Sequence, residues 1–350
     1  MKYLYVLLIF APIAIIGSFL HWSETWLFVA SALAVIPSAG ILGRATEELA
    51  VHTGPRLGGL LNATLGNAAE LIITVFAIRA GLLDLVKASI TGSILGNVLL
   101  VMGFSILFGG LKNGVQRFDR AHAGMNATQL LLAVLALMIP SLFFFAHFEN
   151  VGPVESLSLG TAAAMIAIYA IGLIFSFRST NPEPALAEEV ESEHAGSWSI
   201  AKAILILLAA TALIAWLSEI LVGAVEYTTQ ALGLSEFFIG IIVVPLVGNV
   251  AEHVVAVQAA LKNNMELSMA VSTGSSLQIA LFVAPLLVFL SLLMGNPLTL
   301  VFNQFEVVAL FSGVLIAVFV SQDGETNWLE GAQLLALYVI LALAFFFLPV

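Results

Sequence analysis

Long apolar runs separated by short polar stretches dominate the pattern of residues along this chain. The runs are long enough to cross the roughly 30 Å hydrocarbon core of a bilayer as helices. They lack the apolar–polar alternation over about ten residues that marks the strands of a membrane barrel. The pattern predicts an all-α polytopic membrane protein with about eleven transmembrane helices, at residues 3–20, 26–50, 57–80, 83–108, 127–146, 157–177, 199–225, 236–261, 265–294, 302–320 and 329–348.

The composition agrees with this class and removes several kinds of function. Hydrophobic residues make up 61% of the 350 positions and charged residues 9%. The net charge of −11 is largely local, because five glutamates crowd into residues 183–193. No basic cluster offers a footprint for nucleic acid. The absence of cysteine excludes disulfides, thiolate metal sites and cysteine nucleophiles.

One motif occurs twice, each time inside an apolar segment. The sequence GNAAE at residues 66–70 is followed 182 positions later by GNVAE at residues 248–252. Residues 64–97 align with residues 246–279 without a gap, and 12 of the 34 positions are identical, including a Thr-Gly-Ser triplet. The chain therefore contains an internal duplication.

Basic residues in the connecting loops predict the orientation of the chain. Nine Lys and Arg lie on the side of the N-terminus and two on the other, which places the N-terminus in the cytoplasm and the C-terminus outside. The first copy begins at the second predicted span and the second copy at the seventh. Each copy contains five spans, an odd number, so the two copies enter the membrane from opposite sides. Inverted repeats place a substrate site at their interface, formed by interrupted helices, and support alternating access.

This orientation divides the chain into four parts. They are an N-terminal transmembrane helix at 1–24, a first five-helix repeat at 25–178, an acidic cytoplasmic linker helix at 179–197 and a second five-helix repeat at 198–350. The linker is interpreted as a solvated connector, and the alternative is a cation-sensing regulatory surface.

The duplicated motif carries the candidate chemistry. In a helix, Asn67 and Glu70 share a face, as do Asn249 and Glu252, because each pair is three residues apart. Gly66 and Gly248 permit either close helix approach or a local break. Carboxylates are costly in lipid, by roughly 2.5 to 3.5 kcal/mol on insertion scales, so two of them suggest one shared cation site.

The oxygen atoms of these side chains match the ligands that Ca²⁺ prefers, whereas softer metals call for Cys or several His. Two neighbouring carboxylates in low dielectric cannot both stay charged without compensation, so the empty site should bind protons. Ca²⁺ and protons then compete for Glu70 and Glu252, and competition for one site produces exchange. A purely structural role for this pair is the weaker interpretation.

Further polar groups lie at comparable depth in the second part of each copy. Ser93 and Asn97 share one helical face, and Ser275 and Gln278 share another. These four are candidates for secondary ligands or gate residues, and the alternative is interhelical packing and hydrogen bonding. His253 follows Glu252 directly and is a candidate for tuning proton affinity or for a packing role.

Other acids fall within the predicted spans. Glu219 and Glu226 are seven residues apart and share a face in one helix, and Glu306 lies early in its span. We interpret these three as candidates for a proton or ion path. The alternative is solvation near a helix end, which also applies to Glu47 and Glu48.

These residues resemble the Ca²⁺/H⁺ antiporters, or cation/proton exchangers, of the calcium/cation antiporter superfamily. The matching elements are GNAAE at 66–70, GNVAEH at 248–253, SITGSILGN at 89–97 and STGSSLQIALFV at 272–283, with an acidic stretch between the halves. The resemblance covers essentially the whole chain. It implies one extra helix before two inverted five-helix repeats, with the exchanged ion carried by Glu70 and Glu252.

By the same resemblance Asn67, Asn249, Asn97 and Gln278 match positions near the ion. The sodium/calcium exchanger branch usually has Ser or Thr and Pro before its acid, where this chain has Asn67-Ala-Ala-Glu70, which weakens a sodium-coupled interpretation.

The sequence therefore predicts a secondary antiporter of the cell membrane, not an enzyme, that exports Ca²⁺ from the cytoplasm in exchange for protons. Its expected partners are these two ions and the lipid bilayer, without a cofactor, and self-association into a homo-oligomer stays open. A sodium/calcium exchanger is the nearest alternative, and a cation channel is a more distant one. An intramembrane hydrolase would need a nucleophile and base or a metal motif, and the sequence contains no recognisable set.

Overall fold

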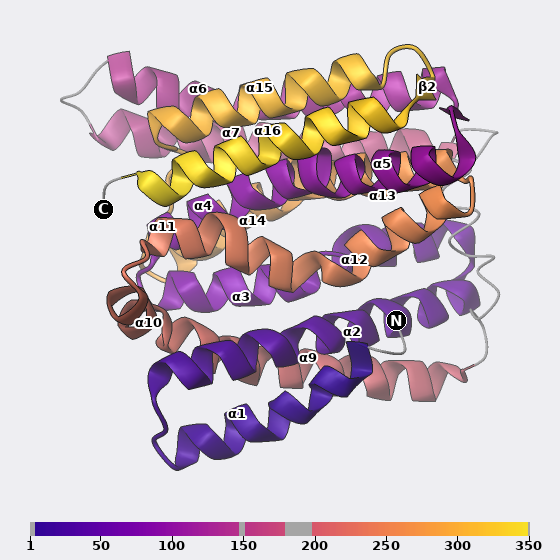
Figure 1. Ribbon diagram of the computed structural model, residues 1–350. Coiled ribbons are helices and arrows are strands. Elements are labelled where there is room, and N and C mark those ends of the chain that lie inside the picture. Colours follow the sequence, from indigo (N-terminus) through magenta and orange to yellow (C-terminus); the bar gives the residue numbers. More distant parts are fainter. Residues whose placement is uncertain (1–3, 147–150, 179–197, 349–350) are drawn as a thin grey trace.

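The fold is built almost entirely from helices (Figure 1). The computed structural model describes residues 4–146, 151–178 and 198–348, so the predicted linker helix at 179–197 lies outside the described residues. The first half contains a 3₁₀ segment at Leu4–Ile9 and helices α1 (Phe10–Phe19), α2 (Glu24–Leu65), α3 (Ala68–Arg79), α4 (Leu83–Leu95), α5 (Met102–Asn113), α6 (Arg120–Ala146) and α7 (Val151–Arg178). The second half contains α9 (Ile200–Gly223), α10 (Val225–Leu232), α11 (Glu236–Phe238), α12 (Val244–Leu261), α13 (Met265–Gln278), α14 (Ala284–Leu293), α15 (Gln304–Val320) and α16 (Trp328–Phe347). Two short strands, β1 (Gln116–Arg117) and β2 (Glu325–Thr326), pair antiparallel.

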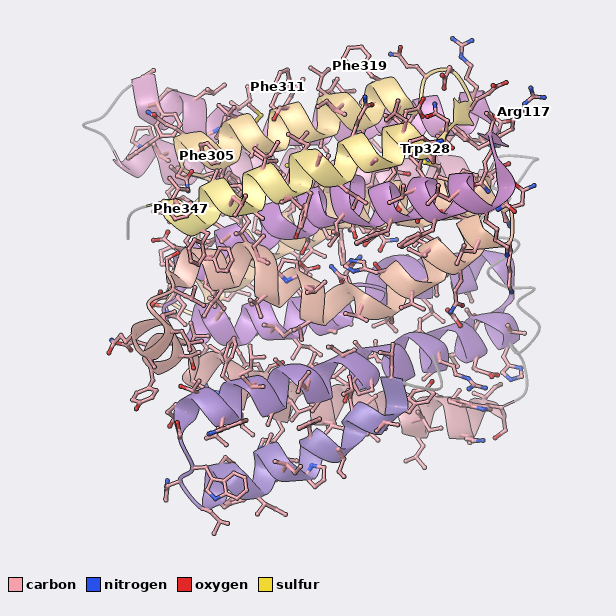
Figure 2. All side chains as sticks on the ribbon, in the orientation of Figure 1. Arg117, Phe305, Phe311, Phe319, Trp328 and Phe347 are labelled. Atoms are coloured by element: carbon pink, nitrogen blue, oxygen red, sulfur yellow. The ribbon has the colours of Figure 1, made fainter. Side chains whose placement is uncertain are left out.

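The described helices are those of a polytopic membrane protein. Eight helical runs are long and apolar enough to cross a membrane, and the segments Leu4–Phe19 and Gln304–Val320 are shorter apolar helices. Large apolar side chains cover the outside of the bundle. Phe311 and Phe319 project from the outer face of α15, and Phe319 is 60% exposed (Figure 2). Such a surface suits contact with lipid.

Helix α2 covers two of the predicted spans, and the loop predicted between them at 51–56 is helical instead. The chain still reverses direction there. A Cβ built on Gly58 would lie 2.9 Å from the carbonyl oxygen of Ala50, whereas residues eight apart in a straight helix are about 12 Å apart.

The helical runs contain three π-helical turns, η2 (Gly96–Val101), η3 (Ile239–Val243) and η4 (Ile279–Val283). The turn η4 lies 182 positions after residues 97–101, so η2 and η4 occupy equivalent places in the two copies of the duplication. A π turn replaces i→i+4 bonds by i→i+5 bonds and often marks a functional site.

Four helices, α3, α4, α12 and α13, lie between two outer groups of helices (Figure 1). On one side α1 packs on α2, and α2 packs along α9. On the other side α5 packs on α16, and α6 packs on α15. The apolar core runs through the middle, where Ile90, Ile94 and Leu99 are fully buried.

The two ends of the bundle gather different segments (Figure 1). The β end contains β1, β2, the loop after α12 and the start of α9. Lys112 Nζ donates to the carbonyl oxygen of Leu261 there at 2.9 Å, and the Trp198 N–H donates to Glu48 Oε2 at 3.0 Å. The opposite end, called the α10 end, contains α10, α11 and the starts of α4 and α15.

Candidate functional site

The two glycines of the duplicated motif act in different ways. At Gly66 the helix breaks: α2 ends at Leu65, Asn67 is the N-cap of α3, and Glu70 lies in the first turn of α3. A carboxylate at a helix N-terminus is stabilised by the helix dipole. Glu252 lies instead inside the uninterrupted helix α12, so of the two possibilities that the sequence left open at these glycines, the local break occurs at Gly66 and not at Gly248.

At Gly248 two helices lie next to each other. A Cβ built on Gly248 would lie 3.6 Å from Glu70 Cβ and 3.8 Å from Glu70 Cα, which is ordinary van der Waals contact. Helix α12 therefore lies beside the start of α3, with space at Gly248 for a methyl group but little more. This contact places the second copy of the motif beside the acid of the first copy.

Glu70 is buried and accepts hydrogen bonds from both halves of the chain. Its side chain is 1% exposed. Oε1 accepts from the hydroxyl of Ser93 and, at 3.5 Å, from that of Ser89, both on α4. Oε2 accepts from Asn249 Nδ2 of α12 at 3.4 Å. Neutral donors therefore surround this carboxylate, and none of these contacts neutralises its charge.

Glu252 repeats the serine contact of Glu70. Ser275 Oγ lies 2.8 Å from Glu252 Oε2, and the two residues are 23 positions apart, as are Ser93 and Glu70. Ser275 Oγ also lies 3.1 Å from Asn67 Oδ1. A hydroxyl has one hydrogen to donate, so Ser275 serves either Glu252 or Asn67 at any moment. Unlike Glu70, Glu252 is only half-buried.

An amide pair joins the two copies beside this acid. Asn67 Nδ2 donates to Gln278 Oε1 at 2.7 Å. A Cβ built on Gly66 would lie 3.4 Å from Gln278 Oε1 and 3.6 Å from Glu252 Oε1, so these groups meet at the helix break. Asn97 Nδ2 in η2 is buried and makes no hydrogen bond with any described group.

These contacts bring most of the predicted site residues together. Glu70, Ser93 and Asn249 form one cluster, and Glu252, Ser275, Asn67 and Gln278 form the other. The two clusters adjoin, and the charge of Glu70 acts on Glu252. Two neighbouring carboxylates that are both ionised need a cation or protons to compensate their charges. The hydroxyl and amide oxygens around them are the hard ligands that suit Ca²⁺.

Glu306 has a structural role that its spacing from Asn303 could have predicted, because Asn followed three residues later by Glu before an apolar run is typical of a helix start. It is 3% exposed and lies in the first turn of α15. Its Oε2 accepts the Asn303 N–H at 2.8 Å and its Oε1 accepts the Thr91 hydroxyl at 3.0 Å. Together with Asn303, it forms a capping box that also ties α15 to α4.

The other predicted path residues lie apart from this cluster. Glu219 lies near the end of α9 and Glu226 in the first turn of α10, and both are exposed. The helix is interrupted at Ala224 between them, so the shared face that we predicted from their spacing is wrong. The path role of Glu219, Glu226 and Glu306 stays a prediction. His253 is half-buried on α12.

Sequence reasoning missed two residues of the site region. Ser89 reaches Glu70, and Thr91 reaches Glu306. Ser89 is four positions before Ser93, so a shared helical face was a signal available in the sequence. The partner of Thr91 comes from a helix more than 200 positions away, which no local pattern reveals.

The chain is similar in sequence and in fold to known proteins over nearly its whole length. The profile of the family described as sodium/calcium exchanger protein matches residues 23–178 and 202–347. The chain is 45% identical to a Ca²⁺/H⁺ antiporter of Aphanothece halophytica, over 98% of this chain and 96% of that protein. It is 43% identical to the Ca²⁺/H⁺ antiporter ChaA of Bacillus subtilis, over 96% of each. Its fold is similar to the structure of native YfkE, with a TM-score of 0.86 and 41% identity over 99% of this chain and 100% of that chain.

Proposed function

Because the chain belongs to the sodium/calcium exchanger protein family, we propose that it is a secondary antiporter that exports Ca²⁺ from the cytoplasm in exchange for H⁺. The observation that carries this proposal is the pair of carboxylates, one from each copy of the motif, set among neutral oxygen donors. The names of its full-length relatives support Ca²⁺ and H⁺ as the exchanged ions. The protein is a transporter and not an enzyme.

The chemistry follows from the two acids. With Ca²⁺ bound, Glu70 and Glu252 are ionised and supply the charge that compensates the ion, while Asn67, Ser275 and Gln278 offer oxygen atoms. Without Ca²⁺, protons neutralise the pair. The serine hydroxyls can donate to an ionised carboxylate and can turn to accept from a protonated one. One site thus holds either cargo, which couples the two ions.

We infer that the chain is organised as one N-terminal helix followed by two inverted five-helix repeats, with the N-terminus in the cytoplasm. The equivalent contacts Ser93–Glu70 and Ser275–Glu252 support this organisation, as do the equivalent π turns η2 and η4. The family profile also matches in two stretches, one on each side of the linker. In this arrangement the β end faces the cytoplasm.

Transport in reconstituted vesicles tests the proposed function. Radioactive calcium uptake into proteoliposomes is measured under an imposed pH gradient, and again under a sodium gradient at equal pH on both sides. We expect uptake with the pH gradient alone, because protons are the ions that compete for the two carboxylates. Uptake with sodium alone would make the protein a sodium/calcium exchanger, and uptake with neither gradient would contradict a role in calcium exchange.

A further inference from the structure

Two glycines close one half of the bundle. Gly92 of α4 faces η3, and a Cβ built on Gly92 would overlap the carbonyl oxygen of Ile241. In the opposite direction, a Cβ built on Gly240 would lie 2.8 Å from Ala88 Cβ and 2.8 Å from the carbonyl oxygen of Leu85. Helices approach this closely only where a side chain is missing. The contact lies on the α10 side of the site, next to Ser93, and the Glu70 side chain that Ser93 contacts is buried.

The equivalent contact toward the β end is not made. Positions 182 residues apart pair Gly92 with Gly274 and Gly240 with Gly58. A Cβ built on Gly274 meets no described atom within 4 Å, and the three nearest atoms to a Cβ on Gly58 all belong to Ala50 of the same helix. Leu57 is 57% exposed whereas its equivalent Ile239 is 1% exposed. Gly58 and Gly59 are buried, and Gly58 packs on Ala50 of its own helix and not on α13.

The end of α2 and helix α13 therefore meet at the site and separate toward the β end. They are joined where Asn67 donates to Gln278 at 2.7 Å. They are no longer in contact at Gly274, one turn away along α13. Glu252, the less buried of the two acids, lies at the point where they diverge. The packing of the two copies is thus asymmetric, because the glycine contact is made on the α10 side of the site and is not made at the equivalent position on the β side.

The two equivalent segments also differ in helical winding. Residues 239–243 form the π turn η3, whereas residues 57–61 are α-helical within α2. A π turn shifts the following residues relative to an α-helix. Residues 239–243, which pack on α4, and the equivalent residues 57–61, which do not pack on α13, therefore have two different backbone forms. Two such forms are what a segment that switches between two states requires.

We propose that Gly274 is the docking position for residues 57–61 of α2 in the opposite access state of the transport cycle. In that state the α2 backbone at Gly58-Gly59 packs on α13 as η3 packs on α4 here, and the contact between Gly92 and Ile241 opens. Gly274 is then a positioning residue that touches no ion and decides whether the site can close toward the β end. This inference rests on the proposed exchange function.

Substitution of Gly274 separates binding from exchange. Gly274→Ala adds one atom, which has no described atom within 4 Å, and Gly274→Val extends one bond further from the same position. We expect both variants to fold and to bind Ca²⁺ from the β end as the parent protein does, which the melting temperature and equilibrium binding check. Closure would bring the added Cβ into the α2 backbone. We expect Gly274→Val to lower pH-driven calcium uptake by about tenfold or more and Gly274→Ala to lower it less. The larger side chain disfavours the state closed toward the β end more strongly, and the transport cycle must pass through that state.

The matched control is Gly172→Val on α7, a half-buried helical glycine that also has no described atom within 4 Å of a built Cβ. It should leave uptake and equilibrium calcium binding unchanged. Parent-level uptake by Gly274→Val would overturn the inference while leaving the exchange function intact. Loss of equilibrium binding together with uptake would also overturn it, because Gly274 would then act on the open site itself.

Thiol labelling gives a second measurement, because the chain contains no cysteine. In Gly274→Cys, a membrane-impermeant thiol reagent applied at the β end should label the protein and stop exchange. The same reagent applied at the α10 end should do neither. Equal labelling from both sides, no labelling from the β end, or full exchange after complete labelling would each contradict a closing contact at Gly274.

Discussion

At the scale of residues, each acid of the site has its own serine at the same spacing. Ser93 donates to Glu70, and Ser275 lies 2.8 Å from Glu252. The remaining partners differ, since Asn249 reaches Glu70 whereas Asn67 turns to Gln278. The two carboxylates are therefore not equivalent, and the half-buried Glu252 is the one that meets ions arriving from the β end first.

Replacing either acid by its amide should abolish exchange. In Glu70→Gln and Glu252→Gln the serine contact can persist, but the negative charge that compensates Ca²⁺ and the group that takes the proton are both lost. The measurement is pH-driven calcium uptake into vesicles, with the melting temperature as a check on folding. Glu325→Gln, at an exposed ion pair with Arg117, is the matched control. Sustained uptake by either site variant would show that the ion is held elsewhere.

At the scale of elements, helix ends and helix contacts position the site. The break after Leu65 frees the N-terminus of α3, and the capping box of Asn303 and Glu306 fixes the start of α15 against α4. Helix α4 carries both Ser89 and Ser93, so α15 supports the helix that holds Glu70. On α4, the residue that contacts the cap of α15, Thr91, thus lies between the two serines that contact Glu70.

Removing the cap of α15 should destabilise the protein without ending transport. Asn303→Ala deletes the acceptor of the Glu306 N–H, and loss of an N-cap costs about 0.5 to 2 kcal/mol. We expect a lower melting temperature in detergent, with exchange by the folded fraction retained, because no described contact joins Asn303 to the two acids. Gln304→Ala, one position on, is the control and should melt like the parent. An unchanged melting temperature for Asn303→Ala would show that the cap contributes nothing.

At the scale of the whole molecule, the bundle is asymmetric although its sequence is duplicated. Gly92 packs against η3 on the α10 side of the site, whereas no described atom lies within 4 Å of a Cβ built on the equivalent Gly274 on the β side. An asymmetry of this kind between equivalent segments is what the proposed alternating access needs, because only one side of the membrane should reach the acids at a time.

The sidedness of the bundle can be measured directly. We expect Asp323→Cys, in the loop before β2, to react with an impermeant thiol reagent from the cytoplasm, and Tyr227→Cys on the exposed face of α10 to react from outside. The reason is the excess of Lys and Arg in the loops predicted at the β end. The unsubstituted chain lacks cysteine and is the control. The reverse pattern would place the open end outside the cell.

The sequence by itself determined the helical membrane class, the duplicated motif and the candidate polar residues near each acid, except Ser89. Helical periodicity and apolar length are local properties, and a gapless repeat identifies equivalent positions without a structure. The capping box of Asn303 and Glu306 is also a local pattern that the sequence contains. Only the tertiary structure decided that the helix breaks at Gly66 and not at Gly248, that Asn249 reaches Glu70 and Gln278 reaches Asn67, and that Thr91 reaches Glu306. Those contacts join atoms distant in sequence, as does that of Ile241 with Gly92, and packing of remote segments leaves no local pattern.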